Sequence, residues 1–375
     1  MNNINGIGEK CCGCQACISV CPRAAIKTIR GVRGELLCKA DDTCINCGKC
    51  VKVCAALNVK LNNASSEFFK VRVKNKKILS KSSSGGIGYV LSDYFLANNG
   101  LVFGAAWDED SQKVKHIKID SMDELYKLQG SKYVQSLMDK SIYKDISELV
   151  KTKKILFIGC PCQVSAVKNV AGCTENLYCI DLVCHGVPSS ELLNEQLKAI
   201  TKSKIKNLSF REGLSFKLDI EDVKKKKYSI LGYDNPYYVL FLTYTSLREC
   251  CYNCSYARRE RVGDITIGDY VENNQGYSCV LINSQKGRLL FENIENAVYY
   301  EKRNADLLIT NEALNHPTQR NKKVDSFSAR YNKRGLKYAY YRTFPVFVIK
   351  RIVRKLLGDR IYECLKRGAY KDERS

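Results

Sequence analysis

The sequence predicts a mixed fold of the α+β or α/β class in three parts: a small cysteine-rich domain, a larger α/β body and a basic helical tail. Three observations predict it. Cysteines cluster in a repeat near the start, strand and helix patterns alternate through the middle, and Lys and Arg alternate with apolar residues near the end. We expect a first domain at 1–62, a second in two parts at 63–150 and 151–310, and a tail at 311–375.

Cysteine is the most informative residue type in this chain. There are 20 cysteines but only three histidines, which argues against a His-rich zinc enzyme. The first ten residues show no basic and then apolar signal pattern, and no uncharged apolar run approaches the ~18 residues of a membrane span. We therefore expect a cytoplasmic protein in a reducing compartment, where abundant cysteine indicates metal binding or catalysis more often than disulfides.

The formal net charge of +22 raises the question of nucleic-acid binding. Lysine is spread along the whole chain, and no helix-turn-helix, zinc-finger or RNA-binding pattern stands out. We therefore expect no nucleic-acid partner. An anionic ligand, an acidic redox partner or an anionic membrane surface explains the charge equally well.

Two cysteine repeats occupy the first 55 residues. The pattern C-x2-C-x2-C-x3-C occurs twice, followed by Pro22 in the first copy and by Ala55 in the second. This spacing is typical of bacterial ferredoxins with two [4Fe-4S] clusters, in which the fourth cysteine of each copy binds the other cluster. The predicted ligand sets are Cys11, Cys14, Cys17 and Cys54 for one cluster, and Cys44, Cys47, Cys50 and Cys21 for the other.

A zinc site is the alternative interpretation of these cysteines. Zinc prefers one tetrahedral set of four ligands, and it does not require eight cysteines at this repeated spacing. Cys12 and Cys38 stand outside the repeat, and we expect them to be small buried thiols. Residues 8–60 thus resemble bacterial ferredoxins, which implies a module that moves single electrons.

The body opens with a strand pattern at 68–73, a Ser- and Gly-rich loop at 82–88 and a helix at 89–97. Such a loop can offer backbone N–H groups to a phosphate, or it can be a plain helix cap. Further strands are expected at 101–107, 113–120, 155–158, 177–183, 208–211, 216–220, 228–231, 261–270 and 278–283, and helices at 122–128, 143–151, 164–170, 190–202 and 286–296. Two cysteine motifs, at 159–163 and 184–186, follow strands of the α/β part, where ligands commonly bind.

Six segments of the body occur in an order that is itself informative. They read SSSGGIG, GSKYVQS, ILFIGCPCQVSAVK, DLVCHGVPS, FRE and CYNCSYARRERVGDITIGDY. Together with the N-terminal repeat, they resemble the coenzyme F420 hydrogenase/dehydrogenase beta-subunit family over roughly residues 8 to 300. That family includes flavoprotein subunits of methanogen hydrogenases and many bacterial members without an assigned substrate.

The resemblance implies FAD bound across two loops of the body. The residues that it assigns to this cofactor are Ser83, Ser84, Gly85, Gly86, Gly130, Ser131, Lys132 and Gln135. Lys132 would offer its charge to a phosphate or to the reduced flavin. Coenzyme F420 enters as an optional hydride carrier, because no motif of this chain establishes it.

The resemblance also implies a third [4Fe-4S] cluster, held by Cys162, Cys184, Cys251 and Cys254. The residues alone agree that four loop thiols with one C-x2-C pair can hold a cube, and they leave buried structural thiols or one zinc ion as alternatives. Cys160 competes with Cys162, and Cys250 with Cys251, and the family motifs favour the second of each pair. The cysteines outside any motif, which we expect to be ordinary core or surface thiols, are Cys173, Cys179, Cys279 and Cys364.

His185 and Asp269 are the candidate catalytic groups, because each lies beside a motif; a structural hydrogen bond is the alternative for both. The family often continues after the Gly-Asp-Phe of the last motif with Trp-Gly, whereas in this chain Asp269-Tyr270 is followed by Val271-Glu272-Asn273. The identity of the substrate is therefore not carried over from the resemblance.

In the tail, Lys and Arg interleave with apolar and aromatic residues at near-helical spacing between 331 and 368. A basic amphipathic helix can lie on an anionic membrane, here the inner membrane face, or dock a partner. The alternative is a helix packed on its own domain.

The expected function is that of an oxidoreductase dependent on FAD and iron–sulfur clusters. Electrons would pass between the ferredoxin-type clusters, FAD and a small substrate or hydride carrier, with a redox partner protein such as ferredoxin. The alternatives are an electron-transfer subunit without a substrate site and, with less support, a zinc-stabilised binding protein. No feature of the sequence predicts the oligomeric state.

Overall fold

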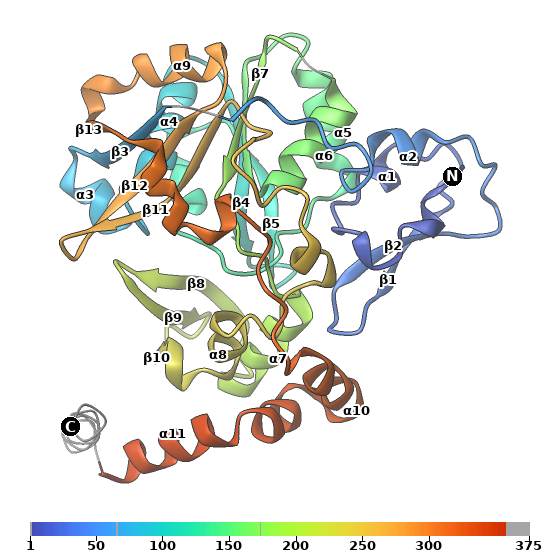
Figure 1. Cartoon of the computed structure of the whole chain (residues 1–375), viewed down its shortest axis with the longest axis vertical. Coiled ribbons are helices and arrows are strands. Elements are labelled where there is room, and N and C mark those ends of the chain that lie inside the picture. Colours follow the sequence, from blue (N-terminus) through green and yellow to red (C-terminus); the bar gives the residue numbers. More distant parts are fainter. Residues whose placement is uncertain (1, 65–66, 173, 358–375) are drawn as a thin grey trace.

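The computed structural model describes residues 2–64, 67–172 and 174–357. It contains β-sheets of two, three and eight strands, with helices packed around them. Figure 1 shows the two-stranded sheet at one side of the large sheet and the three-stranded sheet below it. The protein therefore has the mixed α/β composition that the sequence predicts.

The N-terminal unit is built around a β-hairpin of β1 (Ile26–Arg30) and β2 (Leu36–Ala40). Each cysteine repeat leads into a short helix, α1 (Ala16–Ser19) or α2 (Lys49–Val53). Both helices follow a residue with a left-handed backbone, which lets the chain turn sharply between cysteines. The core of this small unit consists largely of isoleucines and of the cysteines themselves.

The eight-stranded sheet has the order β13-β3-β12-β11-β7-β6-β4-β5. Its strands are β3 (Phe68–Val73), β4 (Leu101–Asp108), β5 (Lys113–Ile119), β6 (Ile155–Gly159), β7 (Leu177–Leu182), β11 (Ile265–Glu272), β12 (Gln275–Ile282) and β13 (Val298–Arg303). The strands β4, β6, β7 and β11 are parallel neighbours, and β3 shares their direction because β12 is antiparallel to both β11 and β3. Their carboxyl ends therefore meet at one edge, where ligands bind in open α/β sheets.

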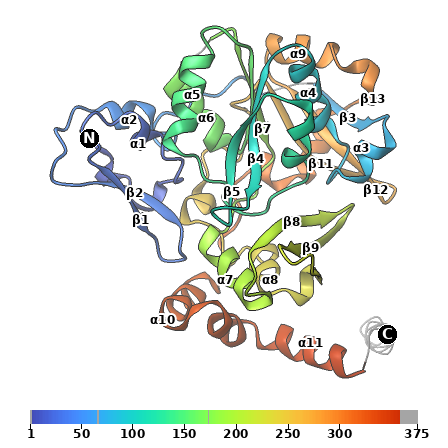
Figure 2. The same ribbon diagram turned by 180° about the vertical axis from the view of Figure 1, so that it is seen from behind.

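Helices cover both faces of this sheet. One face packs against α4 (Ile87–Ala97) and α9 (Gln285–Glu292), and the other against α5 (Lys140–Leu149) and α6 (Pro161–Ala171). Because both faces are buried, the inner strands read as continuous apolar runs. Ala16 of the N-terminal unit packs into the core that α5 and α6 form with the sheet, and Figure 2 shows the unit beside these two helices.

The small antiparallel sheet consists of β8 (Ile205–Glu212), β9 (Ser215–Asp222) and β10 (Lys227–Leu231). It shares a core with α7 (Ser190–Ile200) and α8 (Pro236–Leu242). The four-lysine run of this region lies at the exposed turn between β9 and β10, as a solvated charge run should.

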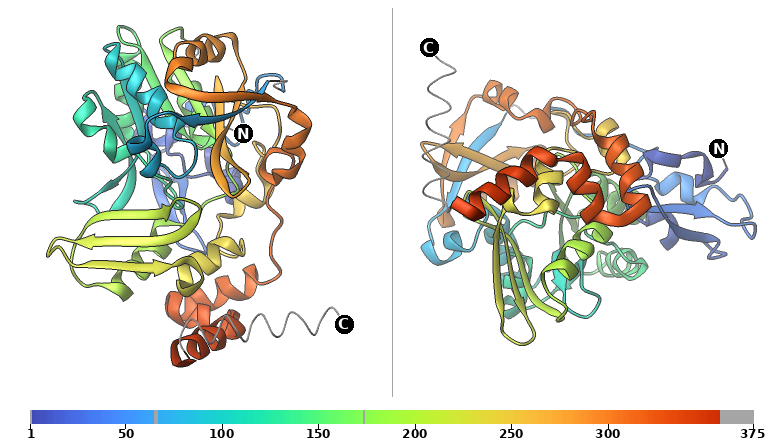
Figure 3. Two further views of the ribbon diagram at one scale, coloured as in Figure 1. Left: turned by 90° about the vertical axis from the view of Figure 1, so that its left-hand side faces the viewer. Right: turned by 90° about the horizontal axis from the view of Figure 1, so that it is seen from below.

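Two helices run along the underside of the small sheet, α10 (Val324–Thr343) and α11 (Pro345–Leu357). Figure 3 shows both helices from below. α10 bends at Gly335, where the backbone turns left-handed, and buries Phe327 and Tyr340 in the core below the small sheet. The first half of the predicted tail helix therefore packs on its own domain, and residues 358–368 of that prediction lie outside the described residues.

Most expected elements occur within a few residues of their predicted positions. The helix predicted at Met122–Leu128 takes the tighter 3-10 form. The hairpin β1–β2, the helix α8 and the edge strand β13 were not predicted. Within the described ranges, no helix combines the length and apolar character that a membrane span requires.

Candidate functional site

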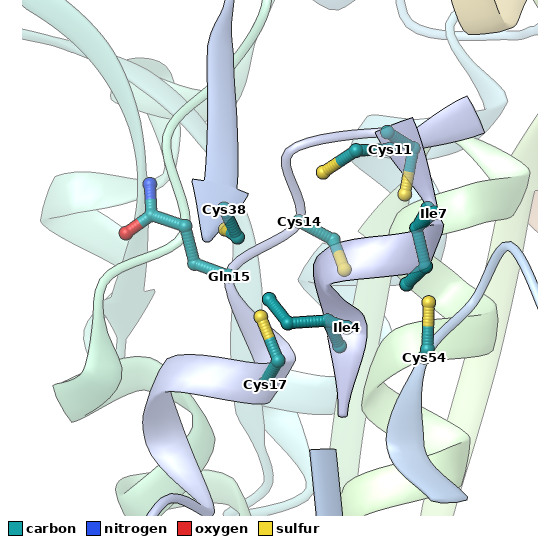
Figure 4. A pocket seen from close by; sticks show the side chains of 9 residues that line it. Ile4, Ile7, Cys11, Cys14, Gln15, Cys17, Cys38 and Cys54 are labelled. Atoms are coloured by element: carbon teal, nitrogen blue, oxygen red, sulfur yellow. The ribbon is translucent and has the colours of Figure 1, made fainter. Parts of the chain in front are cut away.

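The first predicted cysteine set surrounds a single cavity. Its lining residues are Ile4, Ile7, Cys11, Cys12, Cys14, Gln15, Cys17, Cys38 and Cys54. Figure 4 shows sulfur atoms from both cysteine repeats facing this space, with Ile4 and Ile7 beside it. The fourth cysteine of the second repeat thus stands with the first three cysteines of the first repeat.

The second predicted set lines another cavity. Its lining residues are Asn2, Cys21, Pro22, Arg23, Ala25, Ile26, Cys44, Ile45, Cys47, Lys49 and Cys50. Here the fourth cysteine of the first repeat joins three cysteines of the second. Both cavities therefore have the crossed composition that two ferredoxin-type clusters need.

The chemistry of these linings fits a cube better than a lone ion. In the described part of the chain, no three His, Cys, Asp or Glu side chains converge closely enough to hold one metal ion. A [4Fe-4S] cube needs instead four thiolates spread around a void, one for each iron corner. Burial raises the pKa of Cys54 to about 11 and also raises that of Cys50, so a metal charge is needed to hold these thiols as thiolates.

A third group of thiols gathers where three elements of the body meet. Cys160 and Cys162 lie at the start of α6, Cys184 follows β7, and a 3-10 turn with its following residue carries Cys250, Cys251 and Cys254. We call these six cysteines the inner thiol group. The thiol of Cys160 lies against that of Cys184, whose pKa this contact lowers to about 7, and Cys250 lies against Cys251. The group thus contains all four predicted ligands and both of their competitors.

Close packing holds the inner thiol group in shape. Gly186 has a left-handed backbone (φ +115°), and a Cβ atom there would lie 2.8 Å from the Cβ of Cys251. The side chain of Gln163 accepts a hydrogen bond from the backbone N–H of Cys160 (3.0 Å) and donates one to the carbonyl of Ser136 (3.0 Å). The turn that presents Cys160 and Cys162 is therefore tied to the strand-like segment that follows Tyr133.

A buried ion pair supports the segment after Cys254. Arg261 and Asp181 are both inaccessible to solvent and lie 3.2 Å apart. Asp181 also accepts hydrogen bonds from the backbone N–H groups of Val262 and Gly263, while Arg261 donates to the carbonyl of Tyr256 (2.8 Å). A fully hydrogen-bonded pair of this kind specifies one conformation of the loop.

The N-terminal unit meets the inner thiol group at a junction formed by Cys12. Its thiol lies beside the thiols of Cys14 and Cys162, one from each side of the contact. Two tyrosines fasten the units together, because Tyr143 donates to the carbonyl of Cys14 and Tyr256 to that of Ala55, both at 2.6 Å. Cys12 is thus a junction residue, a role that its place between two predicted ligands of the first repeat did not predict.

The loops assigned to FAD lie next to each other. The backbone N–H of Ser131 donates to the hydroxyl of Ser83 (2.7 Å), and the hydroxyls of Ser84 and Ser278 are 3.4 Å apart. Gly86, at the start of α4, has a left-handed backbone (φ +82°). These contacts bring the first loop, the second loop and β12 together near the carboxyl edge of the sheet.

Two residues of the predicted FAD set have other partners. The ammonium group of Lys132 donates to the carbonyls of Leu128 (2.8 Å) and Gln129 (2.9 Å), although burial lowers its pKa to about 7. Gln135 lies at the junction and donates to the carbonyl of Gly13 (3.2 Å). Gly85 and Gly130 belong to the same two loops, and a Cβ at Gly85 would approach the hydroxyl of Ser278 to 2.8 Å.

The two catalytic candidates stand near this edge in different settings. Asp269 forms an ion pair with Arg211 of the FRE motif, which also donates to the hydroxyl of Tyr133 (3.1 Å). His185 stacks on Tyr244 with ring centroids 6.0 Å apart, and burial lowers its pKa. The carboxylate thus has a structural partner, and the imidazole stays mostly neutral near pH 7.

The cysteines without a predicted role fall into two classes. Cys38 lines the first cavity, whereas Cys179 and Cys279 are buried in strands of the large sheet. Cys173 and Cys364 lie outside the described residues.

Comparison with known proteins bears on part of this arrangement. Residues 152–307 match the family described as the C terminus of the coenzyme F420 hydrogenase/dehydrogenase beta subunit. Among solved structures, a chain of the xenon-derivatized F420-reducing [NiFe] hydrogenase complex from Methanosarcina barkeri matches with a TM-score of 0.47 and 18% identity, over 76% of this chain and 99% of that one. No curated protein matches the chain. The stretch that carries the inner thiol group, His185 and Asp269 is therefore similar in sequence to the carboxyl-terminal part of these beta subunits.

Proposed function

We propose that this protein is an iron–sulfur flavoprotein oxidoreductase. The observation that carries the proposal is the crossed lining of the two N-terminal cavities, each with four cysteines drawn from both repeats. In this proposal residues 1–62 form the ferredoxin-type domain, residues 63–150 and 151–310 together form the flavin domain, and residues 311–375 form the tail. The similarity of residues 152–307 to F420 hydrogenase beta subunits supports a redox role.

The order of the sites along the molecule suggests a path for electrons. Cys47 of the second cavity is exposed, and Ile45 beside it is exposed as well. The first cavity lies at the junction, where Cys12 adjoins Cys162. A redox protein such as ferredoxin would therefore meet the second cavity, and the first cavity would connect it to the inner thiol group.

The inner thiol group is proposed to hold a third [4Fe-4S] cluster through Cys162, Cys184, Cys251 and Cys254. The four thiols come from the start of α6, the segment after β7 and the 3-10 turn with its following residue, which the fold brings together, and Gly186 makes room for Cys251. The contact between Cys160 and Cys184 makes Cys160 the competing ligand. Iron content in single Cys→Ala variants at 160 and 162 separates the two assignments.

FAD is proposed to bind at the two adjoining loops near the carboxyl edge of the sheet. The supporting contacts are those of Ser131 with Ser83 and of Ser84 with Ser278, together with the start of α4 at Gly86. A flavin exchanges two electrons with a hydride donor or acceptor and single electrons with clusters, which is the conversion that this arrangement needs. His185 would donate or accept a proton at the substrate, and Asp269 would orient Arg211.

The composition of the purified protein tests this proposal directly. Protein purified without oxygen should contain about twelve irons, a matching amount of sulfide and one FAD per chain, with the broad absorption of iron–sulfur clusters. Zinc in place of iron, or protein with no metal and no flavin, would rule the proposal out.

A surface on α11 supports a further part of the proposal, contact with an anionic membrane. Val346, Ile349, Ile352 and Leu356 are each more than half exposed and recur along the helix, which carries four Lys or Arg and no acidic residue. A helix of this kind can lie in the headgroup region of a bilayer. Flotation with phosphatidylglycerol-containing vesicles should be lost in Ile349→Glu but kept in Leu289→Glu, which changes an equally accessible leucine on α9. Equal flotation of both variants would exclude a role for α11.

A further inference from the structure

Arg248 is a buried cation between the two groups of thiols at the junction. It is only 2% exposed and comes directly before the 3-10 turn that carries Cys250 and Cys251. Its guanidinium reaches across to the N-terminal unit and donates to the carbonyls of Leu36 (2.8 Å) and Cys11 (3.1 Å). It also donates to the side-chain oxygen of Gln135. The guanidinium therefore touches the loop of the first repeat and sits beside the inner thiol group.

This arginine differs from the other buried arginines in what surrounds its charge. Arg33 pairs with Glu35 and Glu249, and Arg261 pairs with Asp181. Arg248 has no carboxylate within ion-pair distance among the described residues, and its Nε has no hydrogen-bond partner. Burial disfavours its charge, and the ionisable groups around it are the thiols of Cys250, Cys11, Cys251 and Cys12.

A buried charge is costly unless an opposite charge lies close to it. Neutral thiols cannot supply that charge, whereas thiolates bound to an iron–sulfur cube can. A [4Fe-4S] cube with four cysteine thiolates is negatively charged overall, and reduction adds one further negative charge. Cys11 and Cys251 are proposed cluster ligands, so the clusters that they hold would place negative charge beside the guanidinium of Arg248.

The first repeat is shaped to admit this arginine. Gly13 has a left-handed backbone (φ +62°), and a Cβ atom there would lie 2.4 Å from the carbonyl oxygen of Leu36 and 2.7 Å from Nη2 of Arg248. The equivalent residue of the second repeat, Asn46, has the same backbone conformation (φ +51°) and carries a side chain that accepts a hydrogen bond from Asn3 (2.7 Å). Backbone geometry therefore tolerates a side chain at this point, and it is the close approach of Leu36, Arg248 and Gln135 that requires glycine in the first repeat.

We propose that Arg248 is the counter-charge of the first-cavity cluster and of the inner cluster, and that it raises their reduction potentials above that of the second-cavity cluster. The inference rests on the proposed function, since it needs the clusters. The cation stabilises the reduced, more negative form of a nearby cluster, so an electron entering at the second cavity is drawn toward the junction. Arg248 acts on the clusters through its charge and is a positioning residue.

Redox titration followed by electron paramagnetic resonance tests this inference on the anaerobically purified full-length protein. Arg248→Gln should lower the potential of the first-cavity cluster so that its reduced-to-oxidised ratio at a fixed potential falls at least about tenfold, or ~59 mV for one electron. The second-cavity signal, assigned by its absence in Cys47→Ala, should not move. Arg248→Lys keeps the charge and should stay closer to the wild type. Arg23→Gln, at an exposed arginine beside the second cavity, should leave the first-cavity potential unchanged.

Each outcome decides the question. Clusters with unchanged potentials in Arg248→Gln would overturn the inference. If Arg248→Gln loses the junction clusters while Arg248→Lys keeps them, the charge is required, as proposed. If both variants lose them, charge alone does not hold the clusters and the hydrogen bonds of the guanidinium do, which overturns the inference. Wild-type protein without iron would instead refute the proposed function, which keeps the two failures distinct.

Discussion

The two cysteine repeats have the same spacing but differ in what they face. Cys12 of the first repeat meets the inner thiol group, whereas the equivalent Ile45 of the second repeat is exposed. Gly13 admits Arg248, whereas Asn46 binds Asn3 within the small unit. Duplicated motifs can therefore diverge in role through the residues between their cysteines, with one copy turned to the body and the other to solvent.

The largest expected effect tests whether the two repeats exchange their fourth cysteines. Cys54→Ala should remove the cluster of the first cavity, although Cys54 belongs to the second repeat, and iron should fall from about twelve to about eight per chain. Cys38→Ala changes a thiol in the same cavity and should keep the full content. Iron analysis with paramagnetic resonance measures both, and loss of the second-cavity signal in Cys54→Ala would refute the crossed assignment.

The next effect separates the inner thiol group from both repeats. Gly186→Ala places a Cβ against Cys251 and forces a left-handed backbone on alanine, so the inner cluster should be lost while both N-terminal clusters stay. Gly213→Ala has the same backbone problem (φ +55°) but open space around it. Iron content should fall by about four in the first variant only. Equal iron in the two variants would mean that the approach of Gly186 to Cys251 does not matter.

The free energy of unfolding should depend on pH through His116, which lies in the body near the contact with the first repeat. Burial lowers the pKa of His116 from 6.5 to about 4, and its ring is hydrogen-bonded to Ser136 and to the carbonyl of Ile158. Between pH 6.5 and 4 the unfolded chain therefore binds more protons than the folded chain. The free energy of unfolding is thus unaffected by this group above pH 6.5, and it decreases as the pH falls below that value. Between pH 8 and 5 the loss from this group is about 2 kcal/mol.

Chemical unfolding at several pH values measures this loss. His116→Gln should flatten the dependence, whereas His316→Gln, at an exposed histidine, should keep it. Because Ser136 adjoins Gln135, which binds the first repeat, acid should weaken the docking of that repeat before it affects the second. An unchanged slope in His116→Gln would show that the imidazole is not held neutral.

The smallest effect measures how firmly the first repeat is docked. Tyr143→Phe leaves the buried carbonyl of Cys14 without its donor and should lower the unfolding free energy by about 1–2 kcal/mol. Tyr126→Phe, on an exposed turn, should change it by less than about 0.5 kcal/mol. Thermal unfolding of both variants makes the comparison. Equal stabilities would mean that the contact between Cys14 and α5 is dispensable.

Local sequence patterns predicted those parts of the fold whose composition differs clearly from that of the neighbouring segments. The inner strands of the large sheet are buried on both faces, so their apolar runs stand out from the loops. β13 and β1 were missed because most of their side chains are exposed, which removes the alternation that marks a half-buried strand. α8 was missed because it is short and apolar on all sides, with no helical period to detect.

The candidate site likewise has one part that local sequence predicted and another that it did not. Spacing within fifty residues indicated which cysteines share each N-terminal cavity, and the ligand and flavin assignments in the body stay predictions. The junction could not be predicted, because Cys12, Gln135 and Arg248 meet only through the packing of distant segments. The one signal in the sequence was weak: Arg248 comes two residues before the adjacent Cys250 and Cys251. Only the structure shows that the other buried arginines have acidic partners.

The contacts of Arg33 have a consequence for how the molecule is made. This residue of the N-terminal hairpin is bound by Glu249 and Ser328, which follow it by more than two hundred residues. A ribosome therefore releases the cysteine repeats long before it has synthesised the surfaces that cover them. In the proposed function, iron delivery to the small unit would have its widest access during that interval, before the carboxyl-terminal helices are complete.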